Sequence, residues 1–207
     1  METTRLFIVR MTGDWLPIVL LEKCVKLYCD IWKEPPRNEF FWSPREVLVD
    51  MWRQFQKPGA GSFFAISVTG EPEELNYQER YDFKRKLAKA DGLNVEIVGF
   101  SWGYLVSRGD LRDISGGDKL DHLFEIDQKI FYIDELGVGS SFRKRGIGEL
   151  LTQKLIDYFR NQGANVITLR TERKAIAARA LYQKLGFQEL PIKDAKHQDR
   201  TYWKLVL

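Results

Sequence analysis

The sequence predicts an α/β (α+β) fold: a single domain with a mixed, largely antiparallel central sheet of about six to seven strands flanked by helices.

 
Two observations predict this class. Runs with strand composition alternate along the chain with stretches whose apolar residues recur at helical spacing. In the first half, strand-like runs succeed one another as hairpin neighbours do, which favours antiparallel pairing. The 207 residues, 44% of them apolar, suffice for one packed core over 1–207.

The first half of the chain shows clear signals for where its helices begin and end. Strands are predicted over residues 5–10, 62–68 and 95–106, and helices over 16–32 and 43–56. Pro35 and Pro36 end the first helix. Ser43, Pro44 and Glu46 supply a capping side chain, a proline at the first helical position and a glutamate at the third. The second helix is therefore expected to begin there.

The second half alternates strands and helices more regularly. Strands are predicted over 129–138, 166–170 and 202–207, helices over 146–162 and 176–185, and a polar loop over 107–120. Gly163 is expected to end the first of these helices. Gly99 and Gly103 allow a bend or a bulge in the strand that contains them. Residues 70–93 are charged and poorly periodic, which predicts a solvated, partly helical insertion between two strands.

Composition excludes several function classes. The 32 basic and 29 acidic residues nearly balance, and no basic cluster large enough for a nucleic-acid interface is present. Cys24 and Cys29 lie on different faces of a predicted helix, so we expect reduced cysteines rather than a disulfide. With two histidines and two cysteines the sequence has no zinc-ligand pattern, and no metal is expected. No signal segment or long apolar run is evident, which predicts a cytoplasmic protein without membrane contact.

A glycine-rich turn between a strand and a helix is the main candidate for a ligand site. Such a turn presents free backbone N–H groups at the positive end of a helix and binds phosphate groups. Gly146 and Gly148 allow close approach of a diphosphate, and Arg143, Lys144 and Arg145 add positive charge. A capped loop with a solvated basic run would use the same residue types.

Two other phosphate motifs fail at this turn. A Walker motif needs lysine and then serine or threonine after its last glycine, whereas Glu149 and Leu150 follow Gly148. A dinucleotide motif half matches at Gly137 and Gly139, but Phe142 stands where a third glycine or an alanine belongs. Neither reading is retained.

The remaining pattern is Arg143-x-x-Gly146-x-Gly148, followed about thirty residues later by Ala178-x-x-Leu181-Tyr182-x-x-x-Gly186-Phe187. With a strand between them, these two motifs resemble the GNAT superfamily of N-acetyltransferases. The resemblance covers residues 131–187 and implies that residues 129–190 form an acetyl-coenzyme A binding core. It also implies an acyltransferase that binds acetyl-CoA as its acetyl donor.

By this resemblance, the backbone of Leu136, Gly137 and Val138 pairs with the pantetheine amides like an added strand, and the Val138 N–H faces the thioester oxygen. The implied cofactor-binding residues are Leu136, Gly137, Val138, Arg143, Lys144, Arg145, Gly146, Ile147, Gly148, Glu149, Ala175, Ala178, Tyr182 and Lys184. Ala175 departs from the family, whose members often have asparagine there to support the pantetheine arm. We expect weaker or differently anchored cofactor binding as a result.

Three residues are candidates for catalysis. Tyr182 corresponds to the tyrosine proposed in the family to protonate the leaving thiolate, although it also fits a plain core aromatic. Asp134 and Glu135 are candidate bases for the acceptor amine, and burial would raise their pKa values toward neutrality. Strand alternation is expected to place these two on opposite faces, so that at most one points at the substrate. We favour Glu135; either carboxylate could instead bind a cationic acceptor or be solvated.

The acceptor side is predicted from aromatic residues. Candidates for substrate binding are Trp32, Phe40, Phe41, Trp42, Trp102 and Tyr104. Ordinary core and loop packing would account for them equally well. Acidic residues of the 107–122 segment suit a cationic amine, as they would a solvated loop; they are Asp110, Asp113, Asp118 and Asp121.

The function predicted is transfer of an acetyl group from acetyl-CoA to a primary amine of a small cationic molecule. The resemblance implies direct attack within a ternary complex. One alternative is a protein acetyltransferase acting on lysine or N-terminal amines. A second alternative, from another class, is a non-catalytic sensor that binds acyl-CoA. Family members are often homodimers, which the resemblance allows here.

Overall fold

The computed structural model describes residues 4–11, 18–35, 37–69 and 94–207 of the chain. Pro36 and the predicted insertion over 70–93 lie outside the described residues. The helices are α1 (Ile18–Lys33), α2 (Pro44–Phe55), α4 (Arg108–Ser115), α5 (Ile147–Asn161) and α6 (Ile176–Lys184), with short 3₁₀ turns at η1 (Asp121–Leu123) and η2 (Ser140–Phe142). The strands are β1 (Thr4–Met11), β2 (Gly61–Thr69), β3 (Asn94–Val106), β4 (Ile130–Val138), β5 (Val166–Glu172), β6 (Gln188–Glu189) and β7 (Arg200–Val206).

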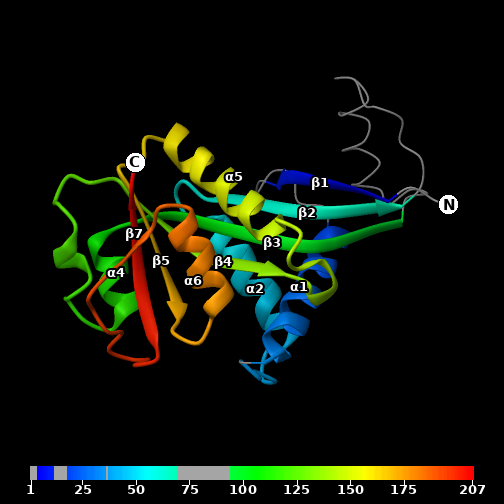
Figure 1. Cartoon of the computed structure of the whole chain (residues 1–207), viewed down its shortest axis with the longest axis horizontal. Helices are drawn as coiled ribbons and strands as arrows, with labels where there is room; N and C mark the ends of the chain where they lie inside the picture. Colours follow the sequence, from blue (N-terminus) through cyan, green and yellow to red (C-terminus); the bar gives the residue numbers. More distant parts are fainter. Residues whose placement is uncertain (1–3, 12–17, 36, 70–93) are drawn as a thin grey trace.

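The strands form one seven-stranded sheet in the order β1-β2-β3-β4-β5-β7-β6 (Figure 1). Every neighbouring pair is antiparallel except β4 and β5, which are parallel. A parallel pair needs a crossover connection, and α5 supplies it between β4 and β5. The predicted mixed, largely antiparallel sheet with flanking helices is confirmed.

Helices cover both faces of the sheet. On one face of the sheet, called the α1 face, α1 and α2 pack on β2 and β3, and α4 packs on β3, β4, β5 and β7. On the other face, called the α5 face, α5 and α6 pack on β2 to β5 and on β7. Apolar side chains that alternate along each strand supply both layers, which is why the central strands are buried on both sides.

The start of α2 follows the predicted capping pattern. The hydroxyl oxygen of Ser43 accepts a hydrogen bond from the backbone N–H of Glu46 at 3.3 Å, and Pro44 occupies the first turn. The predicted loop over 107–120 is wrong, because α4 lies within it. Ser107 and Asp110 form a capping box at its N-terminus. That pattern was present in the sequence as a serine followed three residues later by an acid.

The parallel strands β4 and β5 separate part of the way along. They pair from Ile130 opposite Val166 to Ile133 opposite Leu169. Beyond those residues β4 continues beside β3, and β5 continues beside β7. The edge of β4 that faces β5 is therefore unpaired over its last residues, and the two strands are split apart there.

None of the described helices has the length and hydropathy needed to cross a bilayer.

Candidate active site

A bulge in β4 sets the direction of the two candidate carboxylates. The pairing with β3 passes from Glu135 opposite Trp102 to Ile133 opposite Gly103, which leaves Asp134 as an extra residue. A Cβ on Gly103 would overlap the carbonyl oxygen of Tyr132, so only glycine permits this approach. The bend or bulge predicted at this glycine is confirmed.

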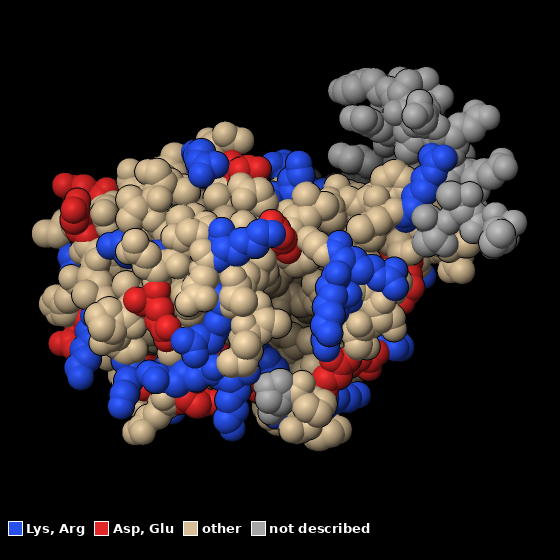
Figure 2. All heavy atoms as spheres, in the orientation of Figure 1, with Lys and Arg blue, Asp and Glu red and all other residues tan. Residues whose placement is uncertain are grey.

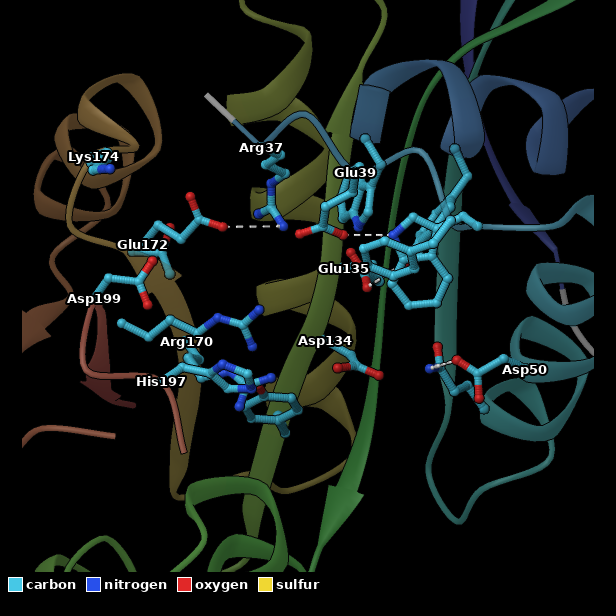
Figure 3. A pocket seen from close by; sticks show the side chains of 18 residues that line it. Arg37, Glu39, Asp50, Asp134, Glu135, Arg170, Glu172, Lys174, His197 and Asp199 are labelled. Atoms are coloured by element: carbon cyan, nitrogen blue, oxygen red, sulfur yellow. Dashed lines mark hydrogen bonds and ion pairs between the residues drawn. The ribbon is translucent and has the colours of Figure 1, made fainter. Parts of the chain in front are cut away.

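The bulge places Asp134 and Glu135 together on the α1 face. Both line the same pocket (Figure 3). Strand alternation predicted opposite faces, and that prediction is wrong because the extra residue breaks the two-residue period at this point. The consequence is a pair of adjacent carboxylates in one cavity.

Each carboxylate is held by a tyrosine from a different element. The Tyr28 hydroxyl, on α1, donates to Glu135 Oε1 at 3.1 Å, and the Tyr104 hydroxyl, on β3, donates to Asp134 Oδ2 at 2.8 Å. Burial, and then the neighbouring Asp134 charge, raise the pKa of Glu135 to about 8. Burial also raises the pKa of Asp134. Two carboxyls this close titrate as a pair, so one of them binds a proton near neutral pH.

The cavity in front of this pair has a volume of about 690 Å³. It lies on the α1 face, between the cluster packed by α1 and α2 and the cluster packed by α4. Its lining comes from distant parts of the chain: Tyr28, Trp32, Arg37, Glu39, Phe41, Trp42, Asp50, Gln54, Tyr132, Asp134, Glu135, Arg170, Thr171, Glu172, Lys174, His197, Asp199 and Arg200. A cavity of this size suits a small molecule.

Only some of the predicted acceptor residues line this cavity. Trp32, Phe41 and Trp42 do. Phe40 is exposed and does not line it. Trp102 is buried behind the cavity, where its indole N–H donates to Gln54 at 2.5 Å.

Tyr104 also lies behind the cavity wall and reaches it only through Asp134. The acidic residues of the 107–122 segment do not line the cavity. Asp110 caps α4, and Asp121 is buried against Arg112 at 2.9 Å. The predicted attraction of this segment for a cationic amine therefore has no counterpart in the cavity.

Several lining residues had no motif that could have identified them. Arg170 on β5 and Arg200 on β7 reach the cavity because those strands are neighbours in the sheet. Arg37 lies over the Trp32 ring at 4.3 Å and pairs with Glu172 at 3.6 Å. These positions depend on tertiary contacts between elements that are far apart in sequence.

The glycine turn lies at the N-terminus of α5. Gly146 is the N-cap residue with φ 79°, a left-handed conformation that favours glycine, and no side chain caps the helix. A Cβ at Gly146 would have no atom within 4 Å, and one at Gly148 would make only ordinary contacts of 3.7 Å and 3.8 Å. Packing within the protein therefore does not require glycine at 148, and the space before the turn is open to a ligand.

Basic side chains surround this turn. Figure 2 shows Lys and Arg atoms over the segment between β4 and α5, beside a hollow in that face. Arg143 is held in place, since its Nε donates to the Val138 carbonyl oxygen at 2.9 Å and its guanidinium pairs with Glu34 at 2.5 Å. The Arg145 guanidinium lies over the Phe142 ring at 5.3 Å. The turn, its free N–H groups and its charge fit a diphosphate.

Other predicted cofactor residues lie around the split. Leu136, Gly137 and Val138 form the part of β4 whose edge is unpaired toward β5. Glu149 and Lys184 pair with each other at 2.6 Å and so connect α5 to α6. Ile147 is buried in the first turn of α5, Lys144 is exposed, and Ala178 packs from α6 on the α5 face.

Ala175 is the N-cap residue of α6, and no side chain caps that helix. An asparagine here would supply an amide where the alanine has only a methyl group.

Tyr182 lies in the buried cluster on the α5 face of the sheet. It is buried on α6, with its ring 5.8 Å from that of Phe187 and 6.1 Å from that of Trp203. Its hydroxyl has no hydrogen-bond partner among the described residues. Burial, followed by the charge of Glu135, raises its pKa, so the phenol stays protonated.

The fold thus combines a glycine turn at the N-terminus of α5, a parallel strand pair that separates beyond Ile133, and a cavity lined by two adjacent carboxylates. A model of the Acetyltransferase (GNAT) family matches residues 25–187. The chain therefore belongs to that family, and the resemblance seen in its motifs is confirmed.

Two curated relatives match a shorter segment. N-alpha-acetyltransferase 30 of Schizosaccharomyces pombe is 41% identical over 56 residues, which are 27% of this chain and 37% of that protein. The ribosomal protein bS18 alanine N-acetyltransferase of Salmonella typhimurium is 36% identical over 58 residues, which are 28% of this chain and 39% of that protein. The matched segments thus span well under half of either relative.

Solved structures share the fold over nearly the whole chain. NAA60 of Arabidopsis thaliana in complex with acetyl-CoA has a TM-score of 0.59 at 14% identity and covers 98% of this chain and 99% of its own. The aminoglycoside N-acetyltransferase AAC(6')-Iy in complex with CoA has a TM-score of 0.56 at 17% identity and covers 92% of each chain. At these identities the likeness concerns the fold.

Proposed function

We propose that this protein is an acetyl-CoA-dependent N-acetyltransferase that acetylates a primary amine bound in the cavity of the α1 face. The observation that carries the proposal is the split between β4 and β5. On one side of it lie the glycine turn and Tyr182, and on the other lie Asp134 and Glu135 in the substrate cavity. The split lets a donor on the α5 face meet an acceptor on the α1 face.

Acetyl-CoA supplies an activated acetyl thioester when it is bound. The N–H groups at the start of α5, with Lys144 and Arg145, are placed to hold its diphosphate. The unpaired edge of β4 at Leu136 and Gly137 is placed to bind its pantetheine arm. The Val138 N–H is the expected donor to the thioester oxygen.

Glu135 is the proposed general base. An acceptor amine enters as an ammonium and must lose a proton before it can attack a carbonyl carbon. The raised pKa of Glu135, about 8, makes its carboxylate a better proton acceptor than an ordinary glutamate. Asp134 keeps this pKa high through its charge and binds the ammonium beside it.

Tyr182 is the proposed general acid. Its phenol is protonated because of its raised pKa, and it has no partner among the described residues that would compete for the proton. It donates that proton to the departing sulfur, which completes the transfer. The ammonium loses two protons as it becomes an amide, the first to Glu135 before attack and the second to solvent after it. Tyr182 gives one proton to the sulfur and regains one from solvent, and Glu135 releases its proton to solvent, so the reaction liberates one proton overall.

A small-molecule acceptor fits the cavity volume of about 690 Å³. The second candidate acceptor is a protein N-terminus, which is favoured by the names of the two curated relatives. A sensor that binds acyl-CoA without turnover is the third candidate, and the presence of Tyr182 at the position of the family's proton donor argues against it.

The test is release of free thiol from acetyl-CoA in the presence of a panel of small primary amines and of peptides with free N-termini. We expect release that depends on a small amine. Stimulation by peptides alone would favour the protein acceptor. Tight acetyl-CoA binding with no acceptor-stimulated release would identify a sensor and overturn the proposal.

A further inference from the structure

The cavity of the α1 face has an acidic wall formed by α1, α2, β4 and the segment after α1. Its four carboxylates accept hydrogen bonds from neutral groups: Glu39 from Trp42 at 2.6 Å, Asp50 from Gln54 at 2.9 Å, Asp134 from Tyr104 at 2.8 Å and Glu135 from Tyr28 at 3.1 Å. None of the four forms an ion pair within the described part of the chain. The negative charge of this wall, less the one proton that Asp134 and Glu135 share near neutral pH, is therefore available to a cationic group of a ligand.

The opposite wall, formed by β5, β7 and the segments beside them, carries cations. Arg170 is fixed there, because its guanidinium donates to Asp194 at 3.1 Å and to the Ile114 carbonyl oxygen at 3.0 Å. Figure 3 shows its guanidinium pointing from β5 across the open space toward Asp134. Lys174 and Arg200 line the same wall and form no ion pair with the residues that the structure describes.

The carboxylates on this second wall do not cancel its charge. Glu172 is paired with Arg37 at 3.6 Å. Asp199 is the other carboxylate that lines this wall. Its single negative charge is smaller than the two positive charges of Lys174 and Arg200.

Hydrogen bonds to the Asp194 carboxylate support this second wall. The Asp194 carboxylate accepts hydrogen bonds from the Tyr202 hydroxyl at 2.6 Å and from the backbone N–H groups of Lys196 and His197 at 2.8 Å. These bonds hold the segment that leads into Arg200 at the start of β7. The second wall is therefore positioned before any ligand arrives.

We propose that the acceptor is a small primary amine that also carries an anionic group, a carboxylate or a phosphate, which Arg200 and Lys174 bind while Asp134 and Glu135 receive the amine. This inference rests on the proposed N-acetyltransferase function. A molecule with both charges matches both walls, whereas a polycation places its second positive charge against the cationic wall.

The experiment compares amines that differ in the anionic group alone. β-Alanine is paired with β-alaninamide, and phosphoethanolamine with ethanolamine, while spermidine represents a polycation. We expect kcat/KM for the anionic member of one pair to exceed that of its neutral partner by about tenfold or more, from charge-assisted hydrogen bonds to the anion. The pair with the larger ratio distinguishes a carboxylate from a phosphate.

Substitutions of arginine test which side chain binds the anionic group of the acceptor. Arg200→Gln should raise KM for the preferred anionic acceptor about tenfold, and by clearly more than it changes KM for the neutral partner. Arg173→Gln is the matched control, because Arg173 is exposed, close in space to the same wall and absent from the cavity lining. It should change neither value.

Equal kcat/KM within both pairs, a preference for spermidine, or an Arg200→Gln effect that is the same on anionic and neutral acceptors would overturn this inference and leave the N-acetyltransferase proposal standing. Absence of acceptor-stimulated thiol release with every amine would instead overturn the proposed function itself.

Discussion

The donor and acceptor sides of this site are built in different ways. The proposed donor side uses contiguous segments, namely the end of β4, the turn from 143 to 148 and one face of α6. The cavity on the acceptor side is assembled from α1, α2, β4, β5, β7 and the segments between them. The comparison teaches that a short local motif can mark where the donor binds, whereas recognition of the acceptor depends on how distant elements meet.

The largest expected effect is on the acceptor side. Glu135→Gln should lower kcat by about a hundredfold, the usual contribution of a positioned base, and leave the Kd for acetyl-CoA unchanged. Steady-state kinetics and a binding titration check this. Glu96→Gln, on an exposed part of β3, is the control and should match the parent.

The same variant gives a pH test. The kcat of the parent should rise with pH through the pKa of Glu135, about 8, as the base loses its proton, and Glu135→Gln should lack that limb. Because folding raises this pKa from 4.5, the folded state holds the proton more tightly, and stability is lost as pH rises toward 8. The variant should therefore gain Tm relative to the parent at the upper end of that range. Identical pH profiles would remove Glu135 as the base.

Tyr182→Phe tests the proposed general acid, which would act where the donor meets the acceptor. Turnover should fall by about tenfold to a hundredfold with acetyl-CoA affinity almost intact, because only the proton donor is lost. Tyr158→Phe is the matched control, since its hydroxyl bonds the Ala60 carbonyl oxygen at 3.1 Å, on the α5 face outside the cavity. Unchanged turnover in Tyr182→Phe would make this tyrosine a packing residue.

Gly148→Ala tests the donor side. Its Cβ would meet nothing closer than 3.7 Å in the protein, and alanine is favoured over glycine in helices by up to about 1 kcal/mol, so stability should be kept or increased. The methyl group would occupy space in front of the turn, so the Kd for acetyl-CoA should rise by about tenfold, a loss near 1.4 kcal/mol. Thermal unfolding and a binding titration measure the two effects.

Gly109→Ala is the control for that substitution, because Gly109 holds the same second position in α4 and a Cβ there meets only Ser107 at 3.5 Å. It should leave acetyl-CoA affinity unchanged. If Gly148→Ala bound acetyl-CoA as the parent does, the turn would not contact the donor.

The smallest expected effect is that of Ala175→Asn. An asparagine side chain at the N-cap of α6 should add about 0.5 to 1 kcal/mol of stability, visible as a higher Tm. If the family's asparagine role applies here, acetyl-CoA affinity should increase as well. A lower Tm would show that the backbone at Ala175 does not admit a capping side chain.

Sequence patterns predicted most of the fold and part of the site. Apolar periodicity located the sheet strands around 62–68, 95–106 and 129–138, and the capping residue Ser43 located α2. The same reasoning missed α4, although Ser107 and Asp110 carried the signal. It also assigned Trp102 to the substrate cavity, whereas the structure buries that side chain behind it.

The sequence by itself determined the family and the position of the glycine turn before α5, because a glycine with a positive φ and the first N–H groups of a helix are properties of a few consecutive residues. Only the tertiary structure decided the acceptor side. The bulge at Asp134 depends on the close approach of Gly103 in the neighbouring strand, and it turned two carboxylates to one face where alternation predicted two. The cationic wall likewise exists because β5 and β7 are neighbours, which no local pattern specifies.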